Sequence, residues 1–125
     1  MNLLLDTHVV IWCFENNKRL KRSAREAIID GNNTVFVSAV STWELAIKAA
    51  LGKISTPDDF ESQQARCDFK SLSVSIQHTL AVKDLPDHHR DPFDRLLVAQ
   101  ARSESLTLVT HDPTIWSYPV PVLKA

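Results

Sequence analysis

The apolar positions of the chain fall into short continuous runs that are separated by longer amphipathic segments. The runs lie at residues 2–5 (NLLL), 34–38 (TVFVS), 72–74 (LSV), 106–110 (LTLVT) and 120–123 (VPVL). A short apolar run without alternation is typical of a strand that is buried on both faces. We therefore predict five strands, of which 72–74 is the weakest.

The segments between these runs have helical character. Helices are predicted at 7–15, 23–31, 41–52, 56–67, 75–85 and 91–105. Ser41 and Asp91 are expected as N-caps, Pro57 as a first-turn residue, and Gly31 and Gly52 as residues just past helix ends. Buried strands that alternate with helices predict an α/β fold, here a three-layer sandwich with a central, mostly parallel sheet flanked by helices.

Length and composition narrow the class of protein. The 125 residues contain no Pro/Gly/Ser-rich linker, so we expect one domain over 1–125. The net charge of −1 argues against coating of nucleic acid by bulk charge but leaves a local basic groove open. Cys13 and Cys67 form no CxxC pair, which favours reduced thiols in a cytosol. We expect no signal peptide and no membrane span, and with only two glycines no phosphate-cradling loop for a nucleotide cofactor.

Four acids stand near the predicted carboxyl edge of the sheet. Asp6 follows the first strand directly, and Asp112 comes just after strand 106–110. Glu44 and Asp94 lie in the first turns of the helices predicted at 41–52 and 91–105. In open parallel sheets, sites form beyond the carboxyl ends of the strands.

Each acid also has a purely structural explanation, which we favour when the residue is considered alone. Ser41 and Glu44 fit a capping box, and Asp94 at the third helical position is favoured by the helix dipole. Asp6 fits an N-cap, and Asp112 before a proline fits a turn.

Considered together, the acids point to a metal site. Like charges in one cleft destabilise a fold unless a cation neutralises them, and all-oxygen ligands favour Mg²⁺ or Mn²⁺ over zinc. Carboxylates with such ions suit phosphoryl chemistry, in which the metal activates water. Capping and chemistry need not compete, so we expect Asp91 to cap its helix and Asp94 to face the site.

The segments LLLDTHVVIW, VSAVSTWELAIKAALGKI, DLPDHHRDPFDRLLVAQA and LVTHDPTIWSYPVPVL, in this order, resemble the PIN-domain ribonucleases, and most closely the VapC-like toxins of toxin–antitoxin pairs. The resemblance covers nearly the whole chain. It places Asp6, Glu44, Asp94 and Asp112 on the acidic, metal-binding catalytic positions of the family. It also places Thr7 and Thr110 on supporting hydroxyl positions, and Ser38 on a small polar position near the same edge.

The resemblance implies Mg²⁺- or Mn²⁺-dependent endonucleolytic cleavage of RNA by a cytoplasmic homodimer that a cognate antitoxin blocks. Asp91 is a fifth acid, for which we expect an outer supporting role. His111 stands where the family more often has a small residue, and we expect it to face solvent.

Basic and aromatic side chains near this edge have less specific roles. Arg90, Arg95, Lys48 and Lys53 are candidates for contact with RNA phosphates, or else pair with acids or lie in solvent. The five histidines form no zinc motif; His8 is expected in a structural role, and His88 and His89 in solvent. Core packing is expected for Trp12 and Trp43, and a core or interface position for Trp116.

Three other functions fit the sequence less well than a nuclease. A haloacid-dehalogenase-like phosphatase needs a second aspartate where this chain has His8. Ser-His-Asp or Cys-His catalysis is disfavoured because there is no GxSxG elbow and neither cysteine has a base partner in the sequence. A catalytically inactive PIN-like module that binds a partner protein is the remaining alternative, against which the complete set of four acids argues.

Overall fold

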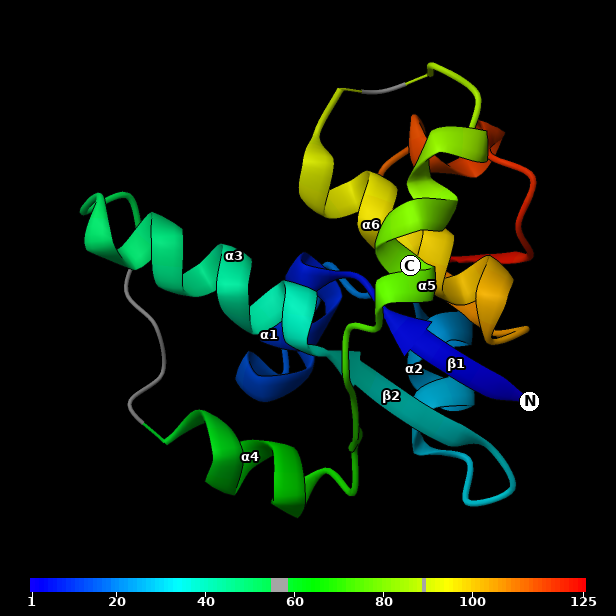
Figure 1. The fold of residues 1–125 in the computed structure, drawn as a ribbon. Helices are drawn as coiled ribbons and strands as arrows, with labels where there is room; N and C mark the ends of the chain where they lie inside the picture. The colour runs from blue at the N-terminus through cyan, green and yellow to red at the C-terminus, as the bar shows by residue number, and fades with distance from the viewer. Residues whose placement is uncertain (55–58, 89) are drawn as a thin grey trace.

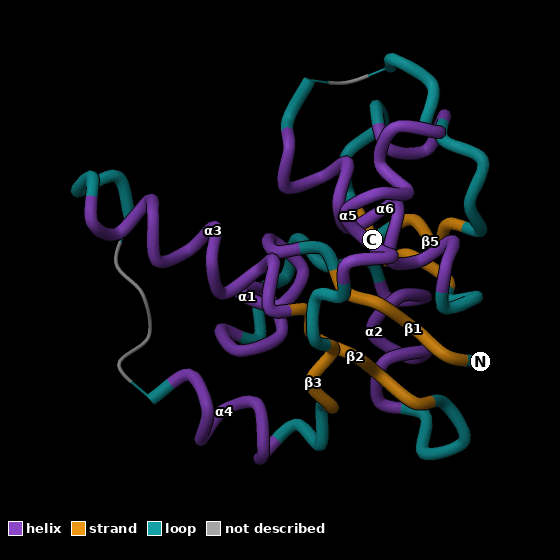
Figure 2. Tube along the Cα trace, in the orientation of Figure 1, coloured by secondary structure: helices purple, strands orange, loops and turns teal. Residues whose placement is uncertain are grey.

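A five-stranded sheet forms the centre of the molecule in the computed structural model, which describes residues 1–54, 59–88 and 90–125 (Figures 1 and 2). The strands are β1 (Asn2–Leu5), β2 (Thr34–Ser38), β3 (Lys70–Leu72), β4 (Thr107–Thr110) and β5 (Val122–Lys124). Their order is β3-β2-β1-β4-β5, and all four pairings are parallel. The predicted parallel sheet is confirmed.

Helices cover both faces of the sheet. They are α1 (Thr7–Glu15), α2 (Arg22–Ile29), α3 (Ala39–Ala50), α4 (Phe60–Arg66), α5 (Ile76–Ala81) and α6 (Pro92–Ser103). Short 3-10 helices span Val82–Asp84 and Ile115–Ser117. The three-layer arrangement predicted from the sequence is therefore confirmed.

The central strand β1 explains why its sequence is continuously apolar. Leu3 and Leu5 belong to one core cluster with residues of α1 and α2, whereas Leu4 belongs to a second cluster with residues of α3 and α6. All three leucines are fully buried. Successive side chains of a strand point to opposite faces, so a strand covered on both sides needs an apolar residue at every position.

Most predicted elements exist, but several boundaries differ. The strand predicted at 72–74 runs over Lys70–Leu72, and the last strand covers Val122–Lys124. Helix 75–85 is the short α5 followed by a 3-10 turn, and the helix predicted from residue 23 begins at Arg22. The predicted start of the helix at 56–67, including Pro57, lies outside the described residues, as does His89.

The N-cap prediction for the third helix was wrong. The helix begins at Ala39, directly after β2, and Ser38 accepts a hydrogen bond from the backbone N–H of Val40. Ser41 therefore lies inside the helix and is fully buried. At the other end the prediction holds, because Gly52 follows the helix with a φ of +72°, a left-handed conformation that glycine adopts without strain.

The strand order reverses at β1. From β1 the chain moves outward to β2 and β3 and then crosses back to β4 on the other side of β1. Such a topological switch point leaves a crevice beyond the carboxyl ends of the two central strands, which here are β1 and β4. In the described part of the chain, no helix is long and apolar enough to span a membrane.

Candidate functional site

Asp6 occupies the carboxyl end of β1 and caps α1. Its Oδ1 accepts a hydrogen bond from the backbone N–H of Thr7 at 2.7 Å, and its Oδ2 accepts one from Thr110 Oγ1 at the same distance. Only 7% of Asp6 is exposed. The N-cap explanation for Asp6 is thus confirmed, and the two threonines that the resemblance singled out lie beside it.

Burial raises the pKa of the Asp6 carboxyl above its usual value of 3.8. The hydrogen bonds from Thr110 and Thr7 and the charge of His8 act in the opposite direction without cancelling the effect. The folded chain therefore holds a desolvated acid whose ionised form a nearby cation would stabilise.

Glu44 comes from the second turn of α3 and is 6% exposed. Thr7 Oγ1 donates a hydrogen bond to Glu44 Oε1 at 2.8 Å and also lies 3.0 Å from Ser41 Oγ. The capping box predicted for Ser41 and Glu44 is wrong, because the N-cap is Ser38, three residues before Ser41. This shift turns Glu44 away from the helix end and toward α1.

Lys48 lies one turn beyond Glu44 on α3. Its Nζ is 2.6 Å from Glu44 Oε2, so both oxygens of this buried carboxylate have a partner. The hydrogen bond to Glu44 raises the pKa of Lys48, and the charges of Asp91 and Asp94 add to this effect. The ammonium thus lies in the field of at least three acids.

The first turn of α6 supplies two acids. Asp91 Oδ1 accepts hydrogen bonds from the backbone N–H groups of Phe93 and Asp94, at 2.9 and 3.1 Å, and Pro92 follows the cap. The predicted N-cap is confirmed. Asp94, three residues on, lines the same pocket as Asp6.

Asp112 follows β4 by two residues. Its backbone N–H donates to Thr110 Oγ1 at 3.1 Å, and its Oδ1 accepts from the backbone N–H of Thr114 at 2.9 Å. The predicted turn is therefore present. The Thr110 hydroxyl holds the backbone of Asp112 and the side chain of Asp6 at once.

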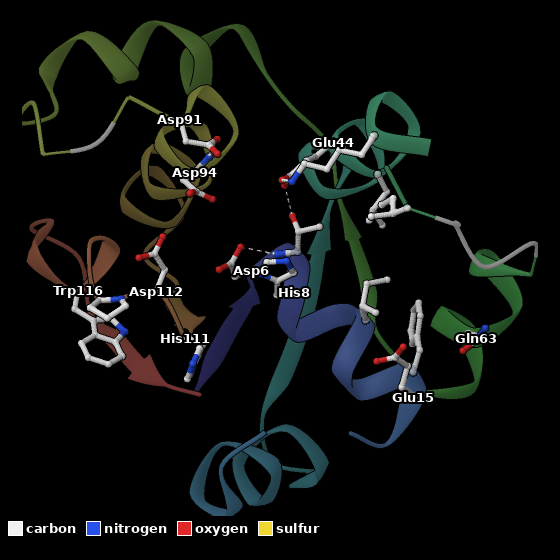
Figure 3. Close-up of a pocket in the computed structure, with 17 residues that line it drawn as sticks. Asp6, His8, Glu15, Glu44, Gln63, Asp91, Asp94, His111, Asp112 and Trp116 are labelled. Carbon is white, nitrogen blue, oxygen red and sulfur yellow. Dashed lines mark hydrogen bonds and ion pairs between the residues drawn. The ribbon is translucent and has the colours of Figure 1, made fainter. Parts of the chain in front are cut away.

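These acids line one pocket of about 1080 Å³ at the switch point between β1 and β4. In Figure 3 the carboxylates of Asp6, Asp94 and Asp112 point toward a shared space, and Glu44 faces them from α3. Asp91 also lines the pocket. Four segments that are distant in sequence thus bring these five carboxylates to one cavity, which Glu15 at the end of α1 also lines.

The predicted donor set fits a hard divalent cation, since Asp6, Glu44, Asp94 and Asp112 are all carboxylates that line the pocket and Asp6 is buried with a raised pKa. The coordination is not preassembled: among the described residues, no group of three acidic, histidine or cysteine side chains forms a complete metal site. The Lys48 ammonium provides positive charge in the same pocket.

Two residues from the predicted site have other partners. Ser38 Oγ caps α3 and donates to Gln100 Oε1, and Ser38 lines a separate cavity. Arg95 donates to the carbonyl oxygens of Pro86 and Val82 and to the hydroxyl of Tyr118. Through these bonds the guanidinium holds the segment before α6 in place, and contact of Arg95 with RNA stays a prediction.

The other basic candidates lie outside the acidic pocket or at its wall. Arg90 and Lys53 are exposed and do not line the pocket, whereas Lys48 does. Contact of Arg90 with RNA stays a prediction.

Of the two tryptophans predicted in the core, Trp12 packs against the core cluster on the side of α1 and α2, whereas Trp43 does not lie in the core. Trp43 was predicted in the core but is 53% exposed and packs edge-on against Phe93, while Trp12 is half-buried. Trp12 stacks on His8 and contacts His111 edge-on. His111 is exposed as predicted, and its Nδ1 lies 2.9 Å from the carbonyl oxygen of Ala125.

His8, His111 and Trp116 all line the pocket. Trp116 is half-buried, its Nε1 donates to the carbonyl oxygen of Thr110, and the ammonium of Lys124 lies 4.4 Å from its ring centroid. His88 is exposed, as expected, and contacts the ring of Tyr118.

Sequence reasoning missed a buried polar network behind the site. Gln100 is fully buried on α6; it accepts from Ser38 and its Nε2 lies 3.3 Å from His78 Nδ1. His78 caps α5 together with Ser75 and bonds through Nε2 to Glu104 at 2.8 Å. The only signal in the sequence was a glutamine on an otherwise apolar helical face.

Comparisons with known proteins agree with this architecture. The family model of the PIN domain matches residues 3–118. Ribonuclease VapC22 of Mycobacterium tuberculosis is 30% identical over 119 residues, which cover 93% of this chain and 91% of that protein. Ribonuclease VapC16 of the same organism is 37% identical over 59 residues, which span 44% of this chain and 42% of that protein.

Solved structures share the fold. A chain in the crystal structure of VapBC2 from Rickettsia felis, bound to promoter DNA, matches with a TM-score of 0.70 and 18% identity over 99% of this chain and 98% of that one. DNA-bound VapBC from Salmonella typhimurium gives a TM-score of 0.67 and 14% identity over the same shares. The family model and the VapC22 match cover nearly the whole chain, and the chain therefore belongs to the PIN-domain family.

Proposed function

We propose that the chain is a divalent-metal-dependent endoribonuclease that acts as a toxin in the cytoplasm and is neutralised by a cognate antitoxin. The observation that carries this proposal is the convergence of Asp6, Glu44, Asp94 and Asp112 on one pocket at the topological switch point. The similarity to two VapC ribonucleases supports RNA as the substrate.

In this proposal Asp6, Glu44, Asp94 and Asp112 hold Mg²⁺ or Mn²⁺, and Asp91 supports Asp94 from the helix cap. When bound, the cation supplies a nucleophilic water and neutralises charge on the scissile phosphate. The all-carboxylate donor set and the raised pKa of buried Asp6 support a hard cation.

The other residues position these acids. Thr110 fixes one oxygen of Asp6 and the backbone of Asp112, while Thr7 fixes the second oxygen of Asp6 through its N–H and Glu44 through its hydroxyl. Such supporting bonds restrict the carboxylates to the orientations that they need for cation binding. Lys48 and exposed Arg90 are the basic groups that we assign to RNA phosphates.

Two partners are part of the proposal. The structural neighbours from Rickettsia felis and Salmonella typhimurium are VapBC complexes, which supports an antitoxin for this chain. A homodimer is supported by large apolar side chains that α5 leaves in solvent, namely Ile76 at 78% and Leu80 at 59% exposure. Light scattering on the purified chain measures the oligomeric state.

The function is tested with labelled structured RNA and the purified chain. We expect discrete cuts with Mg²⁺ or Mn²⁺, none with EDTA, and none by Asp6→Asn or Asp94→Asn, while Asp30→Asn on the exposed end of α2 cuts like the wild type. Circular dichroism verifies that each variant is folded. Cleavage by both site variants would reject the acids as the nuclease site.

The binding-module alternative makes a different prediction. A PIN-like module without catalysis would bind no cation at these acids, so Mn²⁺ would change neither its melting temperature nor its activity. A ligand that binds only the folded state raises the melting temperature. Thermal melting with and without Mn²⁺ therefore distinguishes the nuclease, which Mn²⁺ should stabilise, from the binding module, which it should not.

A further inference from the structure

The Lys48 side chain is partly exposed and lines the acidic pocket. Its Nζ is 2.6 Å from Glu44 Oε2, and Lys48 lines the pocket together with Asp91 and Asp94. The Lys48 side chain is 37% exposed, whereas the Glu44 side chain is 8% exposed. The more exposed ammonium thus contacts a buried acid at the wall of the pocket.

Glu44 has no oxygen without a partner. Oε1 accepts from Thr7 and Oε2 is paired with Lys48. The Thr7 hydroxyl lies in the buried contact between α1 and α3, whereas among the residues that the structure describes Lys48 forms one ion pair, with Glu44. A cation that approaches Glu44 from the pocket therefore meets the ammonium first.

We propose that Lys48 is a built-in counterion that a divalent cation must displace before Glu44 can bind it. The inference rests on the proposed function, because it concerns the same metal site. Lys48 neutralises the acids when no cation is bound and competes with the cation for the same carboxylate. It is a positioning residue for this site, and its ammonium lowers the affinity of the pocket for divalent ions.

The expected size of the effect follows from Coulomb's law. A doubly charged ion and an ammonium a few ångströms apart repel one another strongly enough, even at the dielectric constant of water, to change a dissociation constant about tenfold or more. The ammonium must also leave a short ion pair with a buried acid. Removal of the Lys48 charge should therefore tighten cation binding rather than weaken it.

The test is a titration with Mn²⁺, in which free ion is measured by electron paramagnetic resonance on the full chain without RNA. Lys48→Met removes the charge and keeps a flexible apolar stem. Lys53→Met is the matched control, since Lys53 is exposed, follows the same helix and does not line the pocket. We expect Lys48→Met to bind Mn²⁺ about tenfold more tightly than the wild type, and Lys53→Met to bind like the wild type.

The outcomes separate this inference from the proposed function. Equal or weaker binding by Lys48→Met, with measurable binding by the wild type, overturns the counterion role and leaves the nuclease site intact. No binding by any of the three proteins rejects the metal site and the inference with it. Lys48→Gln, which can still hydrogen-bond to Glu44 without a charge, provides the same comparison if the methionine variant does not fold.

Discussion

The hydroxyl of Thr110 donates to Oδ2 of Asp6 at 2.7 Å and so joins the carboxyl ends of the two central strands, β4 and β1. Both residues are buried, and the same hydroxyl accepts from the backbone N–H of Asp112. The orientation of two acids from opposite ends of the sequence thus depends on one threonine. The site adjoins the core, and the pairing of β1 with β4 sets the relative positions of Asp6 and Thr110.

Thr110→Val removes this donor and leaves a buried carboxylate oxygen without its partner. Loss of a buried hydrogen bond of this kind costs about 1–3 kcal/mol in the free energy of unfolding, measured by urea denaturation. Because the bond orients Asp6, we also expect Mn²⁺ affinity to fall by roughly 10–100-fold. Thr110→Ser, which keeps the hydroxyl, is the control, and equal Mn²⁺ affinity in the valine variant would refute the orienting role.

Asp6 gives the stability of the metal-free chain a characteristic pH dependence. Because the pKa of folded Asp6 is raised, the folded state keeps a proton at pH values where the unfolded chain has lost it. The contribution of Asp6 to stability is thus greatest below its usual pKa of 3.8 and decreases as the pH rises through the raised pKa.

Asp6→Asn lacks this decrease. We therefore expect the free energy of unfolding of Asp6→Asn minus that of the wild type to increase as the pH rises above 3.8. This difference should become constant once the pH exceeds the raised pKa of folded Asp6. Urea denaturation in EDTA across this range measures the difference. If the free energies of unfolding of the two proteins changed with pH in parallel, burial of Asp6 would have no energetic consequence. The loss of metal-dependent cleavage expected for Asp6→Asn is a separate prediction.

Gln100 should matter for stability and not for metal binding. Gln100→Ala leaves Ser38 Oγ without its acceptor and His78 Nδ1 without the Gln100 amide. The expected loss is about 1–3 kcal/mol in the free energy of unfolding. Calorimetric titration with Mn²⁺ on the folded variant should give the wild-type affinity, and a large fall in affinity would mean that this network also positions the acids.

Arg95 is expected to act as a structural residue. Arg95→Met removes its donors to the carbonyl oxygens of Pro86 and Val82 and should cost about 2 kcal/mol in the free energy of unfolding. RNA affinity, measured by fluorescence anisotropy at constant salt, should not change. Weakened RNA binding by a fully folded variant would instead support the phosphate contact that the sequence offered for Arg95.

The two cysteines should differ sharply in reactivity. Burial raises the pKa of Cys13 to about 12, so this half-buried thiol carries almost no thiolate at neutral pH. Cys67 is exposed, and although burial also raises its pKa, reagent can reach it. Mass spectrometry after brief iodoacetamide treatment should find Cys67 modified first, and faster labelling of Cys13 would contradict the packing around α1.

Periodicity and strand patterning were sufficient for the architecture. The continuous apolar run before Asp6 predicts a strand covered on both faces, and this strand is the centre of the sheet. The cap of α6 was also predicted correctly, because Asp91 and Pro92 directly precede an amphipathic segment and so fit an N-cap and a first-turn proline.

The predictions that differ from the structure concern features that depend on tertiary contacts. Ser38 and Ser41 are both good caps, and the direct turn from β2 into α3 selects the first. For Arg95 the sequence left open whether it contacts a phosphate or a neighbouring group, and it does not show that the carbonyl oxygens of Pro86 and Val82 lie within its reach. Trp43 sits on an apolar helical stripe, yet that stripe continues beyond the edge of the core.

The pairing of Lys48 with Glu44 was also open in the sequence. A glutamate four residues before a lysine on a helix favours an ion pair, which at a fully exposed position contributes little. Here Glu44 is buried, so the pair brings a positive charge into the pocket. The sequence alone does not show that Glu44 is buried, and this burial makes the Glu44–Lys48 pair part of the pocket rather than an ion pair on the surface.

The most direct test of the account is the single-turnover rate of RNA cleavage as the Mn²⁺ concentration is raised. Wild type is compared with Asp94→Asn and Asp112→Asn, which alter the pocket, and with Asp87→Asn, an exposed acid that does not line it. We predict that the rate rises and saturates for wild type and Asp87→Asn and stays at background for both pocket variants. Metal-dependent cleavage by the folded pocket variants at the wild-type rate would contradict the assignment of these acids as the nuclease site.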